Sequence, residues 1–96
     1  MSYFYKLFRK RGFGDTIITL YQFDKFRAKQ ADLYKALKNN GSCINAFLRA
    51  RDDLVNNNLI EFRLDENNEK IIYLTDKGKE FYKRIKEIED LLLNNQ

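Results

Sequence analysis

The stretch that decides the fold runs from Ser42 to Phe81 and reads SCINAFLRARDDLVNNNLIEFRLDENNEKIIYLTDKGKEF. It opens with a segment of helical periodicity and passes through three asparagines into two short runs of strand-forming residues. A second helical segment begins after Leu74. Helix, hairpin and helix is therefore the order of elements that the rest of the chain must accommodate.

The helix expected to begin at Ser42 has two different sides. Serine is a good N-cap because its side-chain oxygen accepts from the first free backbone N–H groups. At roughly 100° per residue, the apolar side carries Ile44, Phe47, Leu54 and Val55, with Cys43, Leu48 and Ala50 at its margins. The opposite side carries Ser42, Asn45, Ala46, Arg49 and Asn56.

Two residues of this helix raise questions about burial. Arg51 falls near the centre of the apolar side, where its guanidinium would need a carboxylate such as Asp15, Asp24 or Asp53, or a path for its head to water. We interpret Cys43 as a small buried filler rather than a redox handle.

A β-hairpin is expected after the asparagines. Its strands span residues 59–64 and 70–74, joined by a polar tip in which Asn67 and Asn68 suit positive φ. Before Ser42, the pattern predicts one helix that Asp15 caps and that ends between Phe23 and Phe26, and another over about residues 28–38 that stops at Asn39-Asn40-Gly41.

The last helix is predicted to be capped by Thr75 or Asp76 and to reach about Leu92. Its apolar residues are spaced 4, 3 and 4 apart, a narrow seam that is typical of helix pairing. The aromatic residues of the N-terminal arm are too apolar to remain in water, so we expect them to pack on this helix, in the same chain or in a second one. The expected dimer interface is Phe4, Phe8, Phe81, Ile85, Ile88 and Leu92.

Composition narrows the possible functions. The 96 residues are enough for one compact core, and the chain has no histidine and one cysteine. An internal disulfide and a cysteine-rich zinc site are thus excluded, and the commonest general base is missing. We therefore expect that the protein is not an enzyme and that it binds no metal or cofactor. No small-molecule ligand is evident from the sequence. Without an apolar run of roughly 18 residues or a signal peptide, we expect no membrane association and a cytoplasmic location.

Charge points to a polyanionic partner. The net charge is +4, and the surplus of lysine and arginine lies in residues 1–14 and 24–38. A basic face built from the first third of the chain suits an anionic polymer, although a modest surplus also keeps an ordinary protein soluble.

Two motifs carry a resemblance to a known family. Residues 54–60, LVNNNLI, are similar to Leu-x-x-x-Gly-Leu-Ile, and residues 73–78, YLTDKG, are similar to Tyr-x-Leu-Thr-x-x-Gly. With the order of elements, they resemble the winged helix-turn-helix family, specifically the small regulators of archaea and their viruses. Asn58 stands where the family has glycine, which is tolerable because asparagine accepts left-handed backbone.

The resemblance implies an α+β fold in a single domain, with a three-helix core, a two-strand wing (the hairpin) and a long C-terminal helix. We divide the chain into an aromatic and basic arm (1–14), the winged helix-turn-helix domain (15–75) and a dimerisation helix (76–96). The family inserts its third helix, here residues 42–57, into the major groove of double-stranded DNA. The implied function is sequence-specific transcriptional regulation as a homodimer, in the host cytoplasm if the protein is viral.

The resemblance also implies the contacts. Base edges would be read by the outward residues Ser42, Asn45, Ala46 and Arg49. Phosphates would be held by Arg27, Lys29 and Gln30 at the start of the second helix, and by Arg9, Lys10 and Arg11 in the arm. The wing would contribute weakly, through Arg63, Asn67, Asn68 and Lys70, because Asp65, Glu66 and Glu69 on the same hairpin would be repelled by the duplex.

Three alternatives remain open on sequence grounds. In the first alternative, the polar face of the third helix is exposed to water and binds nothing. The second is a winged-helix module that binds a protein of the transcription machinery, and the third is a non-specific architectural DNA-binding protein.

Overall fold

The computed structural model describes residues 2–94; residue 1 of the expected arm and residues 95 and 96 of the expected last helix lie outside the described residues. Within this part, five α-helices, a short 3-10 helix and three strands follow one another along the chain. In order they are α1 (Tyr3–Phe8), α2 (Arg11–Tyr21), η1 (Asp24–Phe26), β1 (Arg27–Lys29), α3 (Gln30–Asn39), α4 (Ile44–Asn56), β2 (Ile60–Leu64), β3 (Lys70–Leu74) and α5 (Asp76–Leu93).

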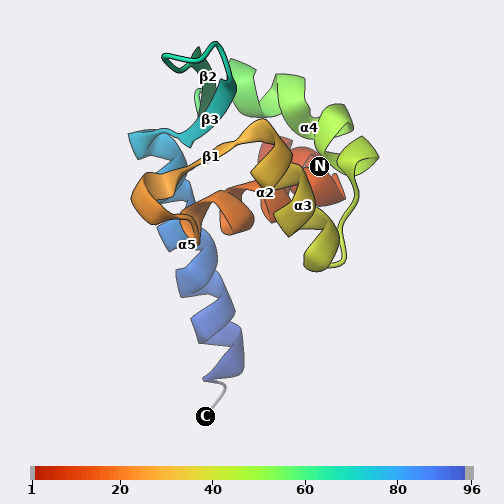
Figure 1. Ribbon diagram of the computed structural model, residues 1–96. Helices are drawn as coiled ribbons and strands as arrows, with labels where there is room; N and C mark the ends of the chain where they lie inside the picture. The colour runs from red at the N-terminus through yellow and green to blue at the C-terminus, as the bar shows by residue number, and fades with distance from the viewer. Residues whose placement is uncertain (1, 95–96) are drawn as a thin grey trace.

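The elements form one body from which α5 projects (Figure 1). The hairpin of β2 and β3 and the helix α4 lie at one end, while α5 runs away from the other end. The overall extents are 50 × 27 × 25 Å. A surface that includes α4 and the hairpin is therefore well separated from the free end of α5.

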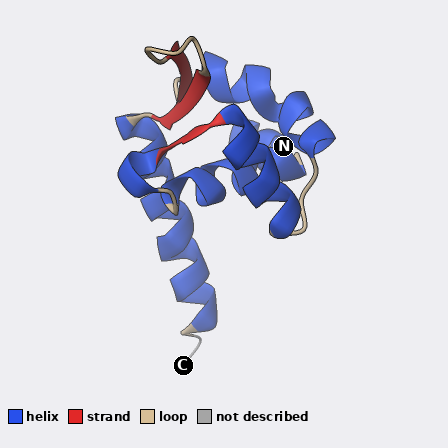
Figure 2. Cartoon of the chain, in the orientation of Figure 1, coloured by secondary structure: helices blue, strands red, loops and turns tan. Residues whose placement is uncertain are grey.

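The sheet has three antiparallel strands in the order β1-β3-β2 (Figure 2). The β2–β3 hairpin confirms the predicted wing, with Ile60 opposite Leu74. The strand β1 was not predicted, because three residues are too few to show an alternating pattern. It pairs with β3 at Arg27 opposite Tyr73 and buries Ala28. This arrangement confirms the predicted α+β winged-helix fold.

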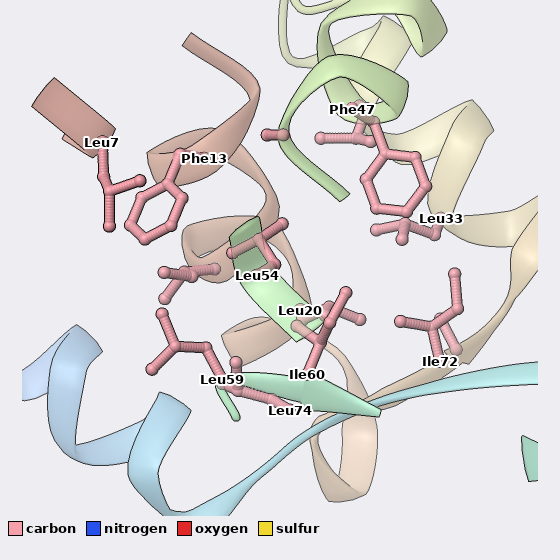
Figure 3. Packing of buried hydrophobic residues seen from close by; sticks show 14 residues of the cluster. Leu7, Phe13, Leu20, Leu33, Phe47, Leu54, Leu59, Ile60, Ile72 and Leu74 are labelled. Atoms are coloured by element: carbon pink, nitrogen blue, oxygen red, sulfur yellow. The ribbon is translucent and has the colours of Figure 1, made fainter. Parts of the chain in front are cut away.

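The core lies between the helices and the inner face of the sheet (Figure 3). Its fully buried members come from five elements and the loop before β2, including Phe13, Leu33, Phe47, Leu59 and Ile72. Burying a side chain of this size contributes roughly 1.5–3 kcal/mol. One shared cluster therefore holds the helices, the hairpin and the base of α5 together.

The N-terminal segment differs most from its expected form. The helix α2 begins at Arg11 rather than at Asp15, so the boundary drawn between residues 14 and 15 falls inside it. Gly12 and Gly14 are buried within the helix, and an additional helix, α1, packs Leu7 into the core. The absence of a side chain at these two glycines permits close packing of neighbouring elements.

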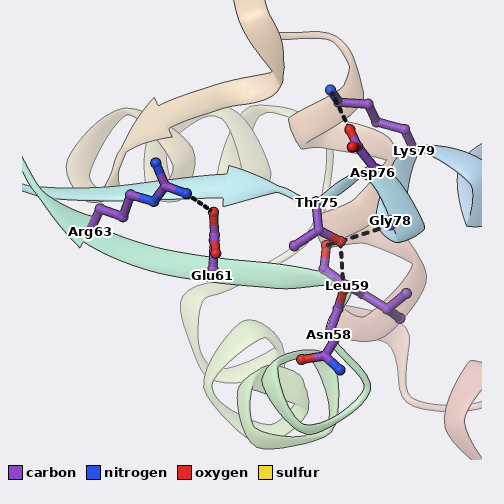
Figure 4. Close-up of polar contacts among 8 residues, drawn as sticks. All are labelled: Asn58, Leu59, Glu61, Arg63, Thr75, Asp76, Gly78 and Lys79. Carbon is purple, nitrogen blue, oxygen red and sulfur yellow. Dashed lines mark hydrogen bonds and ion pairs between the residues drawn. The ribbon is translucent and has the colours of Figure 1, made fainter.

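The junction between α4 and the hairpin follows the expected chemistry (Figure 4). Asn58 adopts a φ of 58°, the left-handed conformation predicted for it. The Thr75 hydroxyl donates to the carbonyl of Asn58 at 2.5 Å and accepts from the N–H of Gly78 at 2.9 Å. Thr75 is therefore the N-cap of α5, as predicted, and it also ties that helix to the end of α4.

We expect Asn58→Ala to lower the free energy of unfolding by about 1 kcal/mol, because alanine pays the full steric cost of left-handed backbone. Asn58→Gly serves as the control and should be at least as stable as the wild type. Chemical denaturation of the three proteins measures the difference. Equal stability of the alanine and glycine variants would contradict the assignment of strain to this position.

No helix among residues 2–94 combines the length and apolar character that crossing a lipid bilayer requires.

Candidate nucleic-acid interface

The outer face of α4 carries two of the four residues expected to read bases. Asn45 and Arg49 are exposed, in agreement with the prediction. Ser42 and Ala46, however, are only 9% and 6% exposed, so the prediction that they face outward is wrong. The helix also begins at Ile44 with Cys43 as its N-cap, not at Ser42.

The close approach of α2 and α4 explains this error. A Cβ atom built on Gly12 would lie 2.0 Å from the carbonyl oxygen of Ala46, so the two backbones touch there. The buried side of α4 is therefore centred on the small residues Ala46 and Ala50, together with Phe47 and Leu54. Because hydrophobic periodicity gives little weight to alanine, the sequence pattern placed the buried side of α4 at the wrong position around the helix.

Several residues assigned to the apolar side consequently lie at the surface. Ile44, Leu48 and Val55 are 41%, 40% and 37% exposed. Arg51 is also exposed and lies 3.7 Å from Asp52, instead of pairing with one of the carboxylates considered from the sequence. Cys43 is exposed as well, so its interpretation as a buried filler is wrong. The small residues Gly12, Ala46 and Ala50 were the available signal for the true packing face.

The basic residues of the arm lie beside α4. Arg9, Lys10 and Arg11 line one surface hollow together with Arg49. Two of them also hold neighbouring elements: Lys10 forms a 2.5 Å ion pair with Asp53 of α4, and Arg11 donates to the carbonyl of Gly41. The structure thus brings the expected phosphate-binding arm next to the expected base-reading helix.

The second expected phosphate site lies where β1 meets α3. Lys29 is the N-cap of α3 and makes no side-chain capping hydrogen bond, and Gln30 begins the helix. The Lys29 ammonium lies 3.3 Å from Glu69 of the hairpin. The Arg27 guanidinium stacks 5.6 Å from the ring centre of Tyr73. The positive end of the α3 dipole adds to these charges.

Internal contacts engage much of the wing. Arg63 pairs with Glu61 at 2.7 Å and also stacks on Tyr73. The Lys70 ammonium lies 5.5 Å from the ring centre of Phe62. At the tip, the Asp65 carboxylate accepts from the backbone N–H of Asn67, and Asn68 has a φ of 60°. The cations of the hairpin thus contact other side chains of the same chain, and the weak contribution of the wing to DNA binding stays a prediction.

The residues of the expected dimer seam form one apolar strip along α5. Phe4 stacks on Phe8 and contacts Phe81 of the same chain, with ring centres 5.2 and 6.0 Å apart. Ile85 is half-buried, whereas Ile88 and Leu92 are 52% and 71% exposed. The aromatic arm therefore packs on the α5 of its own chain and widens the strip. The sequence interpretation omitted Leu91 and Leu93, which are equally exposed.

Ion pairs occupy the remaining faces of α5. Glu80 pairs with Arg84 at 2.9 Å, and Lys86 pairs with Asp90 at 3.2 Å. The Arg84 side chain donates a hydrogen bond to Glu80, and this bond holds the pKa of the carboxyl below its usual value. Such exposed pairs stabilise a helix only slightly, so they do not account for the apolar strip.

Comparison with known proteins supports the fold. Neither a family model nor a curated protein matches the chain. Among solved structures, the chain is similar to a PadR-like transcription factor from Bacteroides fragilis, with a TM-score of 0.69 and 20% sequence identity. The match covers 98% of this chain and 95% of that one. Because α1 and α5 fall within the matched length, the likeness extends beyond the helix-turn-helix core to both ends of the described chain.

Proposed function

We propose that this protein is a transcriptional regulator that binds double-stranded DNA in a sequence-specific manner, with α4 in the major groove. The observation that carries the proposal is the exposed outer face of α4, where Asn45 and Arg49 project beside the cations Lys10 and Arg11. A groove of about 12 Å width admits one helix, and asparagine and arginine are the side chains best suited to adenine and guanine. The structural similarity to a PadR-like transcription factor agrees with this function.

Phosphate contacts on both sides of α4 would fix its position in the groove. Arg9, Lys10 and Arg11 lie on the α2 side, and Arg27, Lys29 and Gln30 lie at the start of α3. Contacts of this kind orient a protein on the duplex without reading its sequence. The wing residues would add little, since the carboxylates of Asp65, Glu66 and Glu69 share the hairpin and would be repelled by phosphates.

A homodimer completes the proposed assembly. The apolar strip along α5 leaves Ile88 and Leu92 largely exposed in the single chain, and a second α5 would cover them. Two copies related by a two-fold axis would present two α4 helices to a two-fold symmetric site. Such a protein would act in the cytoplasm. The archaeal or viral type stays a prediction, which the Bacteroides fragilis neighbour does not support.

Selection of bound duplexes from a random pool, at about 50 and 200 mM salt, tests the proposal. We expect a symmetric motif to be enriched and the affinity to fall roughly a thousandfold between the two salt concentrations. Equal affinity for all duplexes would instead identify a non-specific architectural protein. The absence of any duplex binding, with recovery of a stoichiometric protein partner, would favour the protein-interaction module.

Two alanine substitutions separate base reading from phosphate binding. Arg49→Ala should cost about 1–3 kcal/mol at one base-pair position and relax the preference there, whereas Lys29→Ala should weaken all duplexes alike and reduce the salt slope by about 1. Lys83→Ala, an exposed cation on α5, serves as the matched control and should leave affinity unchanged. Binding of each variant to a set of single-base-pair variants measures both effects. A uniform loss with Arg49→Ala would assign Arg49 to phosphate.

A further inference from the structure

Three aliphatic side chains form a stripe on the outside of α4. Ile44, Leu48 and Val55 fall within about 40° of one another around the helix at roughly 100° per residue. They are 41%, 40% and 37% exposed, while the opposite side of α4 is buried in the core. Asn45 lies beside Ile44 and Leu48 on the same outer face. The face proposed to enter the groove is thus partly apolar.

The charges around the stripe indicate its occupant. Arg49, with Lys10 and Arg11 in the same hollow, lies beyond Asn45 on the α2 side of the stripe, and the exposed Arg51 borders the stripe on the other side. Cations on both flanks complement a polyanion. The stripe also consists of only three partly exposed side chains, which are too few to bury the roughly 800 Å² that a stable protein interface buries on each partner. Both features favour a DNA groove over a protein surface.

One apolar group is available to such a stripe in the major groove, the 5-methyl group of thymine. Ala46, one of the residues expected to read base edges, is buried against α2 and cannot make this contact. Ile44 and Leu48 lie one turn apart in the N-terminal part of α4, which is the part that reaches base edges in helix-turn-helix proteins. Their methyl groups are suited to van der Waals contact with thymine methyls.

Resting on the proposed function, we propose that Ile44 and Leu48 select thymine by its methyl group while Asn45 binds adenine, so that each half-site contains A·T pairs under the start of α4. Val55 lies about 10 Å further along the helix than Leu48, outside this contact. Asp52 separates the two, and its side chain is 87% exposed. A carboxylate there would be repelled by phosphates and limits how deeply the second half of α4 enters the groove.

The test replaces thymine by deoxyuridine, which differs only in lacking the methyl group. The probe is the duplex that the wild-type protein selects from a random pool, with each thymine replaced in turn in both half-sites. We expect the affinity of the wild type to fall about fourfold for each methyl group that is lost at a contacted position. Binding is measured at one fixed salt concentration.

Variants assign the contact to residues. Leu48→Ala should bind the thymine and deoxyuridine duplexes equally at one position, and Ile44→Ala should do so at a neighbouring position. Both sites are exposed on a helix in which alanine is favourable, so the variants should fold. Val55→Ala is the matched control, an equally exposed aliphatic of the same stripe, and should keep the full sensitivity to the methyl group.

The possible failures can be told apart. Strong, salt-dependent binding to a selected motif that lacks thymine, or that tolerates deoxyuridine throughout, would overturn methyl recognition and leave the proposed function intact. Sensitivity that persists in both alanine variants would overturn the assignment to Ile44 and Leu48. If no duplex were selected at all, this result would contradict both the proposed function and this inference.

Discussion

Gly12→Ala is expected to lower the free energy of unfolding by about 3 kcal/mol, the upper end of the range for overpacked sites. A Cβ at this position would meet the carbonyl oxygen of Ala46 at 2.0 Å, its carbonyl carbon at 2.3 Å and the nitrogen of Phe47 at 2.8 Å. All three atoms belong to backbone, so no side-chain rotation relieves the clash. The helices α2 and α4 would have to separate, which would loosen the core around Phe13 and Phe47.

Thermal and chemical denaturation measure this effect. For a domain of this size, 3 kcal/mol corresponds to a decrease in Tm of roughly 12–24 °C. Gly14→Ala, two residues further along the same helix, is the matched control. Its nearest neighbours are ring atoms of Phe8, the closest at 3.0 Å, and this ring is 38% exposed and can move.

The contrast between the two glycines is the informative result. Alanine is intrinsically better than glycine inside a helix by about 1 kcal/mol, so Gly14→Ala should be close to neutral. If both variants had the stability of the wild type, this result would contradict the close approach of the α2 and α4 backbones at Gly12. The orientation of α4, and with it the outward position of Asn45 and Arg49, would then have to be reconsidered.

Ile88→Glu is expected to convert the proposed homodimer to a monomer and to reduce the affinity for a two-fold symmetric duplex by about 100-fold or more, since linked binding of the two half-sites would be lost. Ile88 is 52% exposed in the single chain and lies at the apolar hollow that Phe4, Phe81 and Ile85 also line. A carboxylate there would be tolerated in the monomer but would cost several kcal/mol if buried against a second α5.

Light scattering coupled to size-exclusion chromatography measures the mass, and duplex binding measures the affinity. Lys83→Glu is the control, because it makes the net charge more negative than Ile88→Glu does, at an exposed position of α5 outside the apolar seam. It should remain dimeric. An unchanged mass for Ile88→Glu, with the wild type dimeric, would show that the dimer uses another surface. Retention of tight symmetric-site binding by a monomeric variant would contradict the linked-site explanation.

Local sequence signals located most of the hairpin and its neighbouring junctions. Asn58 has the left-handed backbone expected at the end of α4, Thr75 caps α5, and the strand Lys70–Leu74 has the predicted bounds. These features depend on residues close together in the chain, so their chemistry can be read without knowing the rest of the fold. The same reasoning predicted the seam of α5, whose residues do lie along one apolar strip; the pairing with a second copy stays a prediction.

Three other features escaped the sequence because each depends on a distant partner. The strand β1 is only three residues long and is defined by its pairing with β3. The start of α2 at Arg11 places two glycines inside a helix, an arrangement that local propensity disfavours. The rotation of α4 was missed because periodicity ranked Ile44, Leu48 and Val55 above Ala46 and Ala50 as core residues.

The sequence by itself determined the order of helix, hairpin and helix from α4 to α5, the turn chemistry of the hairpin and the caps that separate α4, the wing and α5, because these depend on contacts within a few residues. The tertiary structure alone decided which side of α4 faces outward. That choice follows from the backbone contact between Gly12 and Ala46, where the absence of side-chain bulk lets two helices touch. Close packing favours small residues at such a crossing, and it therefore leaves larger aliphatic side chains on the face proposed to meet DNA.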